Sequence, residues 1–338
     1  MKPRGIALIG SGSIAEQHLR AIQDLPGLRL AGVFSRSKEK AQKLGAQGGC
    51  RWTSDYRELL GDPAVEVVDV VTSSGSHGTI AIEALEAGKH VIVEKPMAMT
   101  VPECDRMVGL SRERGLSLSV VSQRRFEEQN RVIKGLVDGG AIGRLLLVEV
   151  SCPYYRTQEY YRSADWRGKI ATDGGAIMNQ GIHSVDLMLW FAGPARSVMG
   201  RCATQTHAME AEDLALAIVS FQNGAFGTIM ASTSIQPGFQ PCLNLYGEKG
   251  TIKLDGATIA HWTVPGAAKP ETGEKAASAG VNDPKLSSHR HHRLQIEDAL
   301  QAIEERRPPL VTGEDGRRAV ALIQGLYRAS ESGRPVDL

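Results

Sequence analysis

Three small residues near the start of the chain have the spacing of a dinucleotide-binding turn. The segment reads GSGSIA, with glycines at 10 and 12 and an alanine at 15. Gly10 permits a sharp turn, and Gly12 lets the backbone approach a pyrophosphate at the N-terminus of a helix. Ala15 allows close packing of that helix on the preceding strand. A plain strand–helix turn would also explain the pattern. The residues expected to contact a cofactor here are Gly10, Gly12, Ser13 and Ile14.

A Glu-Lys-Pro triplet, Glu94 to Pro96, directly follows the apolar run Val91–Val93. Proline cannot extend a strand ladder, and a charged pair is costly to bury without partners. The run before the triplet is predicted to be a parallel strand, and ligands collect at the carboxyl ends of such strands. We therefore expect Glu94 and Lys95 to face the cofactor.

A second polar group lies in the other half of the chain, where Asn179, His183 and Asp186 are spaced i, i+4 and i+7. This spacing predicts that they share one helical face. An imidazole has an ordinary pKa near 6.5, so His183 suits proton transfer near neutral pH. A purely structural histidine is the alternative interpretation.

Metal ligation is not expected. A zinc site at His183 lacks further ligands at suitable spacing. The HRHH tract, residues 289–292, follows a segment rich in Pro, Gly, Ala and Ser and has no cysteine or carboxylate companion in the sequence.

The elements that must hold the first group alternate between strands and helices. Apolar runs at 6–9, 28–34, 65–71 and 116–122 are nearly continuous, as strands buried on both faces of a parallel sheet are. They predict a doubly wound Rossmann domain over residues 1–122. Three further cofactor contacts are expected in the loop and helix start after the third of these runs: Thr72, Ser73 and His77.

The end of the second strand favours NADP over NAD. An NAD enzyme usually offers an acid there, whereas this chain has Ser35 and Arg36. An arginine fork suits a 2′-phosphate. Alternatively, Arg36 is solvated or stacks on the adenine of NAD.

Residues 123–338 predict a second α/β domain for substrate binding and oligomerisation. Strand-like runs at 145–151, 197–204, 214–221, 225–234 and 243–246 indicate a large, mostly antiparallel open sheet. Asn223-Gly224 is a hairpin signal. One face of such a sheet needs cover, so we expect a homodimer or homotetramer. Residues 263–288 are predicted to form a surface loop, followed by two closing helices at 293–305 and 316–332.

The segment at 153–167 is unusually dense in aromatic and guanidinium groups. Aromatic faces with polar tips often hold sugars. A surface loop or a subunit contact would explain the composition equally well. The side chains expected to line a sugar site are Tyr154, Tyr155, Arg156, Tyr161, Trp166 and Arg167.

Composition excludes several classes of protein. The chain has 338 residues and a net charge of +1, which gives no reason to expect nucleic acid or membrane binding. Its five cysteines include no CxxC pair and argue against a disulfide framework. No uncharged apolar run approaches the roughly 20 residues of a membrane span. A cytoplasmic location is expected.

Taken together, GSGSIAEQH, GKHVIVEKP and GGAIMNQGIHSVD resemble, in order and spacing, the Gfo/Idh/MocA oxidoreductases. The resemblance covers essentially the whole chain. It implies a Rossmann domain followed by an α/β domain, and a nicotinamide between Lys95 and His183 with a pyranose or cyclitol over it. It also implies a cis Lys95–Pro96 peptide bond.

By this resemblance Lys95 and His183 are the catalytic residues. Lys95 would stabilise negative charge on the substrate oxygen, His183 would carry the proton, and Glu94 would orient Lys95. The expected function is hydride transfer between NADP, or NAD, and a secondary hydroxyl or ketone of a hexose derivative or cyclitol. The substrate contacts expected are Arg125, Tyr154, Trp166, Arg167, Asn179, His183 and Asp186.

Many members of this family carry an Asp four residues before the histidine, where this chain has Asn179. An amide cannot accept the proton, so an Asp-assisted relay is not expected. The NQGIH version resembles branches acting on sugar nucleotides, glycosides and other modified hexoses. The alternatives are a glycoside hydrolase that oxidises its sugar transiently with bound NAD, and a non-catalytic NAD(P) sensor.

Overall fold

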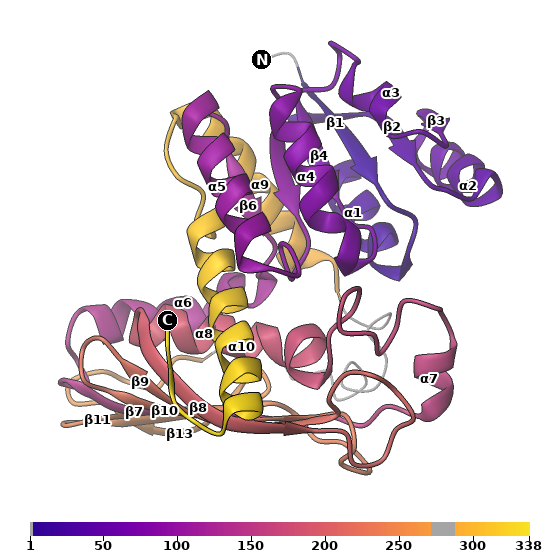
Figure 1. Cartoon of the computed structure of the whole chain (residues 1–338). Helices are drawn as coiled ribbons and strands as arrows, with labels where there is room; N and C mark the ends of the chain where they lie inside the picture. Colours follow the sequence, from indigo (N-terminus) through magenta and orange to yellow (C-terminus); the bar gives the residue numbers. More distant parts are fainter. Residues whose placement is uncertain (1–2, 272–287) are drawn as a thin grey trace. The chain divides into compact units, whose positions relative to one another are not determined.

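The computed structural model describes residues 3–271 and 288–338 (Figure 1). The chain forms two compact units. The first contains residues 1–123 and 288–317, and the second contains 124–287 and 318–338. The division thus differs from the expected boundary after residue 122, because residues 288–317 join the first unit.

The first unit contains a six-stranded, all-parallel sheet in the order β3-β2-β1-β4-β5-β6. Its central strands are buried on both faces, and residues 6 to 9 of β1 are all fully buried. This confirms the predicted Rossmann sheet. The strands are β1 (Arg4–Ile9), β2 (Leu28–Phe34), β3 (Arg51–Thr53), β4 (Val67–Val70), β5 (His90–Val93) and β6 (Leu118–Val120).

The helices of this unit pack their apolar stripes against the sheet and one another. They are α1 (Ser13–Gln23), α2 (Lys38–Gly48), α3 (Arg57–Leu60), α4 (His77–Glu86), α5 (Val101–Arg114) and α9 (Arg290–Glu305), with a 3₁₀ turn at Ser74–Ser76. Leu19 and Ile22 of α1 share a buried cluster with Ile296 and Leu300 of α9. The amphipathic pattern of α9 predicts a buried stripe but does not specify which sheet the stripe covers.

The second unit contains an eight-stranded sheet in the order β13-β12-β11-β7-β10-β9-β8-β14. Only β7 and β10 pair in parallel, so the predicted mostly antiparallel sheet is confirmed. The strands are β7 (Leu145–Pro153), β8 (Ala195–Ala203), β9 (Leu214–Phe221), β10 (Phe226–Ser232), β11 (Cys242–Gly247), β12 (Thr251–Asp255), β13 (Thr258–Thr263) and β14 (Val336–Asp337).

The predicted hairpin between β9 and β10 is present. Gly224 has a φ of +86°, and Phe221 N–H donates to the carbonyl of Ala225 at 2.9 Å. Four of the observed strands were not expected: β3 in the first unit and β12, β13 and β14 in the second. Most of the predicted surface loop, residues 272–287, lies outside the described residues.

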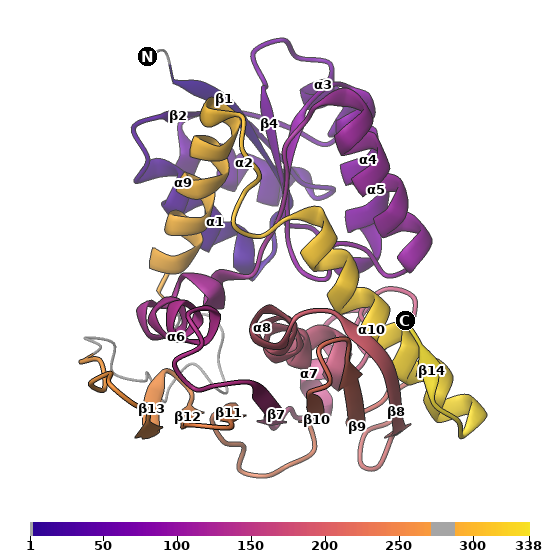
Figure 2. The same ribbon diagram turned by 90° about the vertical axis from the view of Figure 1, so that its left-hand side faces the viewer.

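Helices α6 and α8 lie on the same side of this sheet (Figure 2). The helical elements are a 3₁₀ turn (Gln123–Phe126) where the units meet in sequence, α6 (Glu128–Asp138), α7 (Gln158–Arg162), a π-helix (Ala176–Gly181), α8 (Ile182–Ala192) and the part of α10 (Gly313–Ser332) after residue 317. Among the described residues no helix is long and apolar enough to cross a membrane.

Candidate active site

The glycine turn between β1 and α1 has the geometry that a pyrophosphate site requires. Gly10 has a φ of +137°, and a Cβ there would lie 2.5 Å from the carbonyl oxygen of Val71, so only glycine fits. Gly12 is the N-cap of α1, and a Cβ added to it would meet no atom within 4 Å. No side chain caps the first turn of α1, which leaves the N-terminus of the helix accessible to an anion. Gly12 and Ser13 are exposed and Ile14 is half-buried.

At the end of β2, Ser35 and Arg36 have different environments. Ser35 is buried, its hydroxyl lies 2.7 Å from that of Ser11, and it accepts the N–H of Ser37 at 3.2 Å. Arg36 is exposed. Of this pair, only Arg36 presents its polar group to solvent.

His77, expected among the cofactor contacts, has a buried ring that is 1% exposed. Its Nδ1 lies 2.8 Å from the carbonyl oxygen of Pro96, and its Nε2 lies 3.0 Å from that of Thr72. Burial lowers the pKa of His77, so the ring is neutral and donates to one of these carbonyls at a time. His77 therefore contacts the backbone of both loops, the one after β4 and the one after β5. Thr72 and Ser73, which precede it, are half-buried.

Lys95 lies two residues after the end of β5 and is half-buried. Its peptide bond to Pro96 is cis, as the resemblance implies. Glu94 is 5% exposed and continues the strand ladder through its N–H to the carbonyl of Val70. The Oε2 atom of Glu94 accepts the backbone N–H of Lys95 at 3.0 Å. Glu94 thus fixes the backbone that carries the ammonium group.

In the second unit, the segment predicted to carry Asn179, His183 and Asp186 on one helix consists of a π-helix followed by an α-helix. Asn179 lies in the π-helix, whereas His183 is the second residue of α8. A π turn has wider spacing than an α turn and is frequent at functional sites.

Glu212 holds the start of the π-helix. Its carbonyl accepts the N–H of Ala176 at 2.8 Å, and its Oε1 accepts the N–H of Ile177 at 2.9 Å. A Cβ on Gly175 would lie 2.0 Å from the Glu212 carboxylate, so only glycine allows this approach. Burial raises the pKa of Glu212 to about 7 although these N–H groups oppose the shift.

Asn179 has a carboxylate neighbour that the sequence analysis did not identify. Its Nδ2 donates to Oδ1 of Asp173, whose Oδ2 accepts the N–H of Gly168 at 2.7 Å. Asp173 is 1% exposed. The Asp-Gly-Gly sequence that begins at 173 was the available signal, because a buried acid before two glycines needs N–H donors close by.

Arg125 and Asp186, both expected to bind substrate, bind each other. Their two hydrogen bonds measure 2.8 and 2.6 Å, and both side chains are buried. The Arg125 guanidinium also lies 5.4 Å from the ring centroid of Trp190. Such a paired, two-pronged contact indicates a structural tie between the 3₁₀ turn and α8.

The aromatic and guanidinium side chains of 153–167 form a stacked cluster around Tyr160, which was not predicted. The guanidinium of Arg167 lies 4.0 Å from the Tyr160 ring and 4.7 Å from that of Trp166. Arg156 lies 5.5 Å from Tyr160 and 5.8 Å from Tyr154. We call these five residues the Tyr160 cluster.

The Tyr160 cluster is tied to the π-helix, because Gln180 Nε2 donates to the Tyr160 hydroxyl at 3.3 Å. Tyr161, which was expected to line the same site, is 6% exposed, and its hydroxyl lies 2.7 Å from that of Thr233. Tyr155 is half-buried and forms an isolated bridge with Ser234.

Comparison with known proteins matches both halves of the chain to one family. Residues 4–122 match the NAD-binding Rossmann fold of the Gfo/Idh/MocA oxidoreductase family, and residues 134–338 match the C-terminal alpha/beta domain of the same family. The chain therefore belongs to the Gfo/Idh/MocA oxidoreductases, as the resemblance implied.

Three similar proteins illustrate the range of the family. The WlbA dehydrogenase from Bordetella pertussis, solved in complex with NADH and UDP-GlcNAcA, is 32% identical with a TM-score of 0.88, over 100% of this chain and 99% of its own. UDP-N-acetylglucosamine 3-dehydrogenase of Acidithiobacillus ferrooxidans is 27% identical over 93% of both chains. scyllo-Inositol 2-dehydrogenase (NAD(+)) of Bacillus subtilis is 25% identical over 98% of this chain and 95% of its own.

Proposed function

We propose that this protein is an NAD(P)-dependent oxidoreductase that transfers hydride to or from a secondary alcohol carbon of a hexose joined to a nucleoside diphosphate. The observation that carries this choice is the Tyr160 cluster. It places two guanidinium groups and three aromatic rings beside the π-helix of Asn179. The similarity to a dehydrogenase solved with UDP-GlcNAcA supports the same choice.

The chemistry of a nucleotide sugar matches this cluster better than that of a free cyclitol. A diphosphate carries negative charges that guanidinium forks bind in pairs, and a base has a flat face that stacks on aromatic rings. A free inositol has neither feature. Its hydroxyl groups would need only side chains such as Asn179.

The catalytic roles follow from the chemistry of each side chain. A bound nicotinamide would supply the hydride acceptor for oxidation of the carbinol carbon, and the hydride donor for the reverse reaction. Lys95, in the first unit, places its ammonium by the substrate oxygen and stabilises the negative charge that develops there. His183, in the second unit, takes the hydroxyl proton during oxidation and returns it during reduction. Asn179 hydrogen-bonds the sugar but carries no proton.

A substrate panel tests the proposed function. UDP-N-acetylhexosamines, their uronic acids, free hexoses and inositols are each mixed with enzyme and NAD(P), and reduced nicotinamide is followed at 340 nm. Mass spectrometry of the product then shows the loss of two hydrogens. We expect turnover of at least one UDP-sugar and a higher kcat/KM for it than for any free sugar or inositol. The reverse ranking would contradict the proposal.

Two arginines refine that test. Arg167 belongs to the Tyr160 cluster, whereas Arg162 is exposed at the end of α7. Losing a charge-assisted hydrogen bond costs about 1.5–3 kcal/mol, which corresponds to roughly 10- to 100-fold. Arg167→Ala should raise KM for the UDP-sugar by that factor, and the matched control Arg162→Ala should leave it unchanged.

For the cofactor, we propose a preference for NADP(H). Arg36 is exposed at the end of β2, and no acid stands there to repel a 2′-phosphate. The hydroxyl of Ser35 is already engaged by Ser11, so the preference depends mainly on Arg36.

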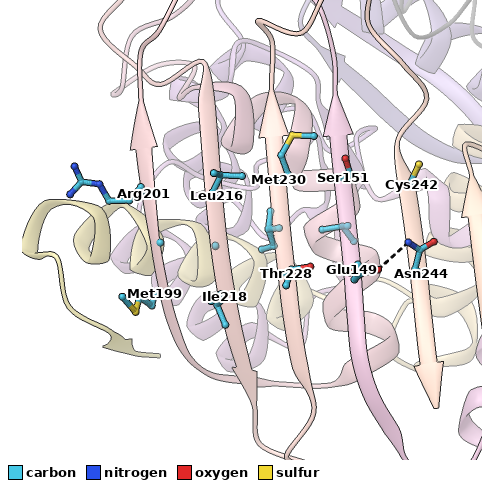
Figure 3. A pocket seen from close by; sticks show the side chains of 14 residues that line it. Glu149, Ser151, Met199, Arg201, Leu216, Ile218, Thr228, Met230, Cys242 and Asn244 are labelled. Carbon is cyan, nitrogen blue, oxygen red and sulfur yellow. Dashed lines mark hydrogen bonds between the residues drawn. The ribbon is translucent and has the colours of Figure 1, made fainter. Parts of the chain in front are cut away.

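For the assembly, we propose a homodimer formed through the outer face of the second-unit sheet. Met199, Leu216 and Ile218 on neighbouring strands are 49%, 49% and 56% exposed. They line a shallow depression of about 520 Å³ across β8, β9, β10, β7 and β11 (Figure 3). Arg201 and Glu149 lie on the same face, so a two-fold arrangement of two copies can pair opposite charges around an apolar centre.

A further inference from the structure

Two histidines that were given no catalytic role lie beside Glu94. His18 ends the GSGSIAEQH motif on α1, and His292 comes from the HRHH tract on α9. Both belong to the first unit, and their ring centroids are 5.1 Å apart. Both rings face Oε1 of Glu94, the residue that precedes Lys95.

His18 is held between two carboxylates. It is 1% exposed, with Nδ1 2.7 Å from Oδ2 of Asp69 and Nε2 3.2 Å from Oε1 of Glu94. Both neighbours are carboxylates, and a ring with a proton on each nitrogen can donate to both at once. Burial opposes this charge, but the two carboxylates outweigh burial and raise the pKa of His18 to about 10. His18 is therefore an imidazolium ion.

Glu94 connects this buried pair to Lys95. Burial alone would raise its pKa, but His18 lowers the pKa of Glu94 to about 2, so the group is a carboxylate. Its Oε1 faces His18, and its Oε2 accepts the backbone N–H of Lys95. An unbroken series of hydrogen bonds therefore runs from Asp69 through His18 and Glu94 to the Lys95 backbone.

His292 has a different relation to the same carboxylate. Its ring is 4% exposed, and its Nε2 lies 3.8 Å from Oε1 of Glu94. Within residues 3–271 and 288–338, neither ring nitrogen has a hydrogen-bond partner. Burial and the nearby charge of His18 lower its pKa to about 3, so it is neutral. The neutral ring lies against the Glu94–His18 ion pair, and all three side chains are buried, so the pair lies in low-dielectric surroundings. In a low dielectric the attraction between the two charges is stronger.

We propose that His18 and His292 are positioning residues for Lys95. His18 holds the Glu94 carboxylate by a charge-assisted hydrogen bond, and His292 shields that bond. Glu94 in turn fixes the backbone from which the ammonium extends. The proposal rests on the proposed function, in which Lys95 acts on the substrate oxygen.

A bound metal is the competing explanation for this cluster. His18 Nε2, Glu94 and His292 offer ligand atoms within 4.8 Å of one another. Ligation would require His18 to give up the proton that Glu94 accepts, and imidazole binds metals only in the neutral form. The geometry therefore favours the proton-bonded cluster.

A double-mutant cycle tests the positioning role. His18→Gln should lower kcat roughly 10- to 100-fold, and His292→Leu roughly 3- to 10-fold, with the Kd of the cofactor nearly unchanged. The control His289→Gln should leave kcat unchanged, because His289 contacts Asp24 on the surface and not Glu94. In a Lys95→Met background, His18→Gln should lower kcat less than about 2-fold, because the group that it positions is gone.

Several outcomes would overturn the proposal. One is a fall in kcat caused by His18→Gln that is equally large in the wild-type and in the Lys95→Met background. Another is a stoichiometric metal in the wild-type protein, detected by elemental analysis, that His292→Leu removes. Wild-type kcat in Lys95→Met would refute the proposed function, whereas wild-type kcat in His18→Gln alone would refute only the positioning role. If His18→Gln does not fold, Glu94→Gln keeps the side-chain shape and should show the same non-additivity with Lys95→Met.

Discussion

At the scale of single residues, Asn179 stands where an acid could have relayed a proton to His183. Its amide donates to the buried carboxylate of Asp173. A carboxylate therefore lies near this position, and it comes from the loop just before the π-helix, six residues earlier in the chain. Both oxygens of that carboxylate accept hydrogen bonds, one from Asn179 and one from the N–H of Gly168.

We expect Asn179→Ala to act on substrate binding. KM should rise roughly 10-fold while kcat stays within about 3-fold, because an amide contributes contacts and no proton transfer. Steady-state kinetics on the true substrate measure both constants. A large fall in kcat with unchanged KM would assign Asn179 a role in the chemical step.

Asn179→Asp should behave differently. It would place two carboxylates in hydrogen-bonding contact, and like charges at that distance raise the pKa of one of them. We expect a new step in the pH dependence of kcat/KM that neither the wild-type protein nor Asn179→Ala shows. An unchanged pH profile would mean that the new acid is not close to Asp173 in the working enzyme.

Arg36 is the residue that should set the cofactor preference. Arg36→Ala should raise the Kd of NADP(H) roughly 10- to 100-fold and change that of NAD(H) less than about 2-fold. Lys43→Ala, an exposed cation further along α2, is the matched control. Fluorescence titration of the reduced cofactors gives the four constants. A wild-type preference for NAD(H), or equal effects on both cofactors, would contradict the assignment.

At the scale of elements, the π-helix is the feature that sequence periodicity could not predict. Apolar and polar residues between 176 and 192 fit one continuous α-helix, and the predicted helical face followed from that spacing. The widened turn is specified by Glu212 and Gly175, which approach closely but lie far apart in the sequence. In contrast, the turn at Gly10 and the hairpin at Gly224 depend on local chemistry and were predicted correctly.

Glu212 predicts a pH dependence of stability. Its pKa is about 7 in the folded protein and about 4.5 when unfolded, so the folded state holds the proton more tightly. The stabilisation is fully present below pH 4.5 and is lost as the pH rises through 7. Glu212→Gln cannot ionise. Its free energy of unfolding relative to wild type should therefore increase between pH 4.5 and 8, by up to about 3 kcal/mol. Urea unfolding at several pH values measures this difference, and a constant difference would contradict the raised pKa.

At the scale of the whole molecule, the sequence was sufficient to predict both sheet types, because strand burial leaves a direct pattern. Continuous apolar runs mark the parallel sheet, and alternation marks the antiparallel one. The sequence analysis did not predict that α9 belongs to the first unit. Ile296 and Leu300 form an ordinary amphipathic stripe, and the local sequence does not show which helix or sheet that stripe packs against. The ion pair of Arg125 with Asp186 was not predicted either, because the two residues are far apart in the sequence.

The exposed face of the second-unit sheet predicts the assembly state. Ile218→Glu places a charge among the exposed apolar side chains of this face, where burial in a dimer would be costly. We expect a dimer or a larger assembly for wild type at micromolar concentration and a shift toward monomer for this variant. Glu128→Lys, a charge change on α6 away from this face, should have no effect. A wild-type monomer in light scattering would contradict the proposed interface.

The proposal that His183 carries the substrate proton is tested most directly by a pH–rate series. The kcat of wild type and of His183→Asn is measured from pH 6 to 9 on the true substrate, with cofactor Kd as the control. We predict that His183→Asn retains cofactor binding and loses about 10²- to 10⁴-fold in kcat, the usual range for removing a positioned proton carrier. Wild-type kcat in His183→Asn across this pH range would contradict the account.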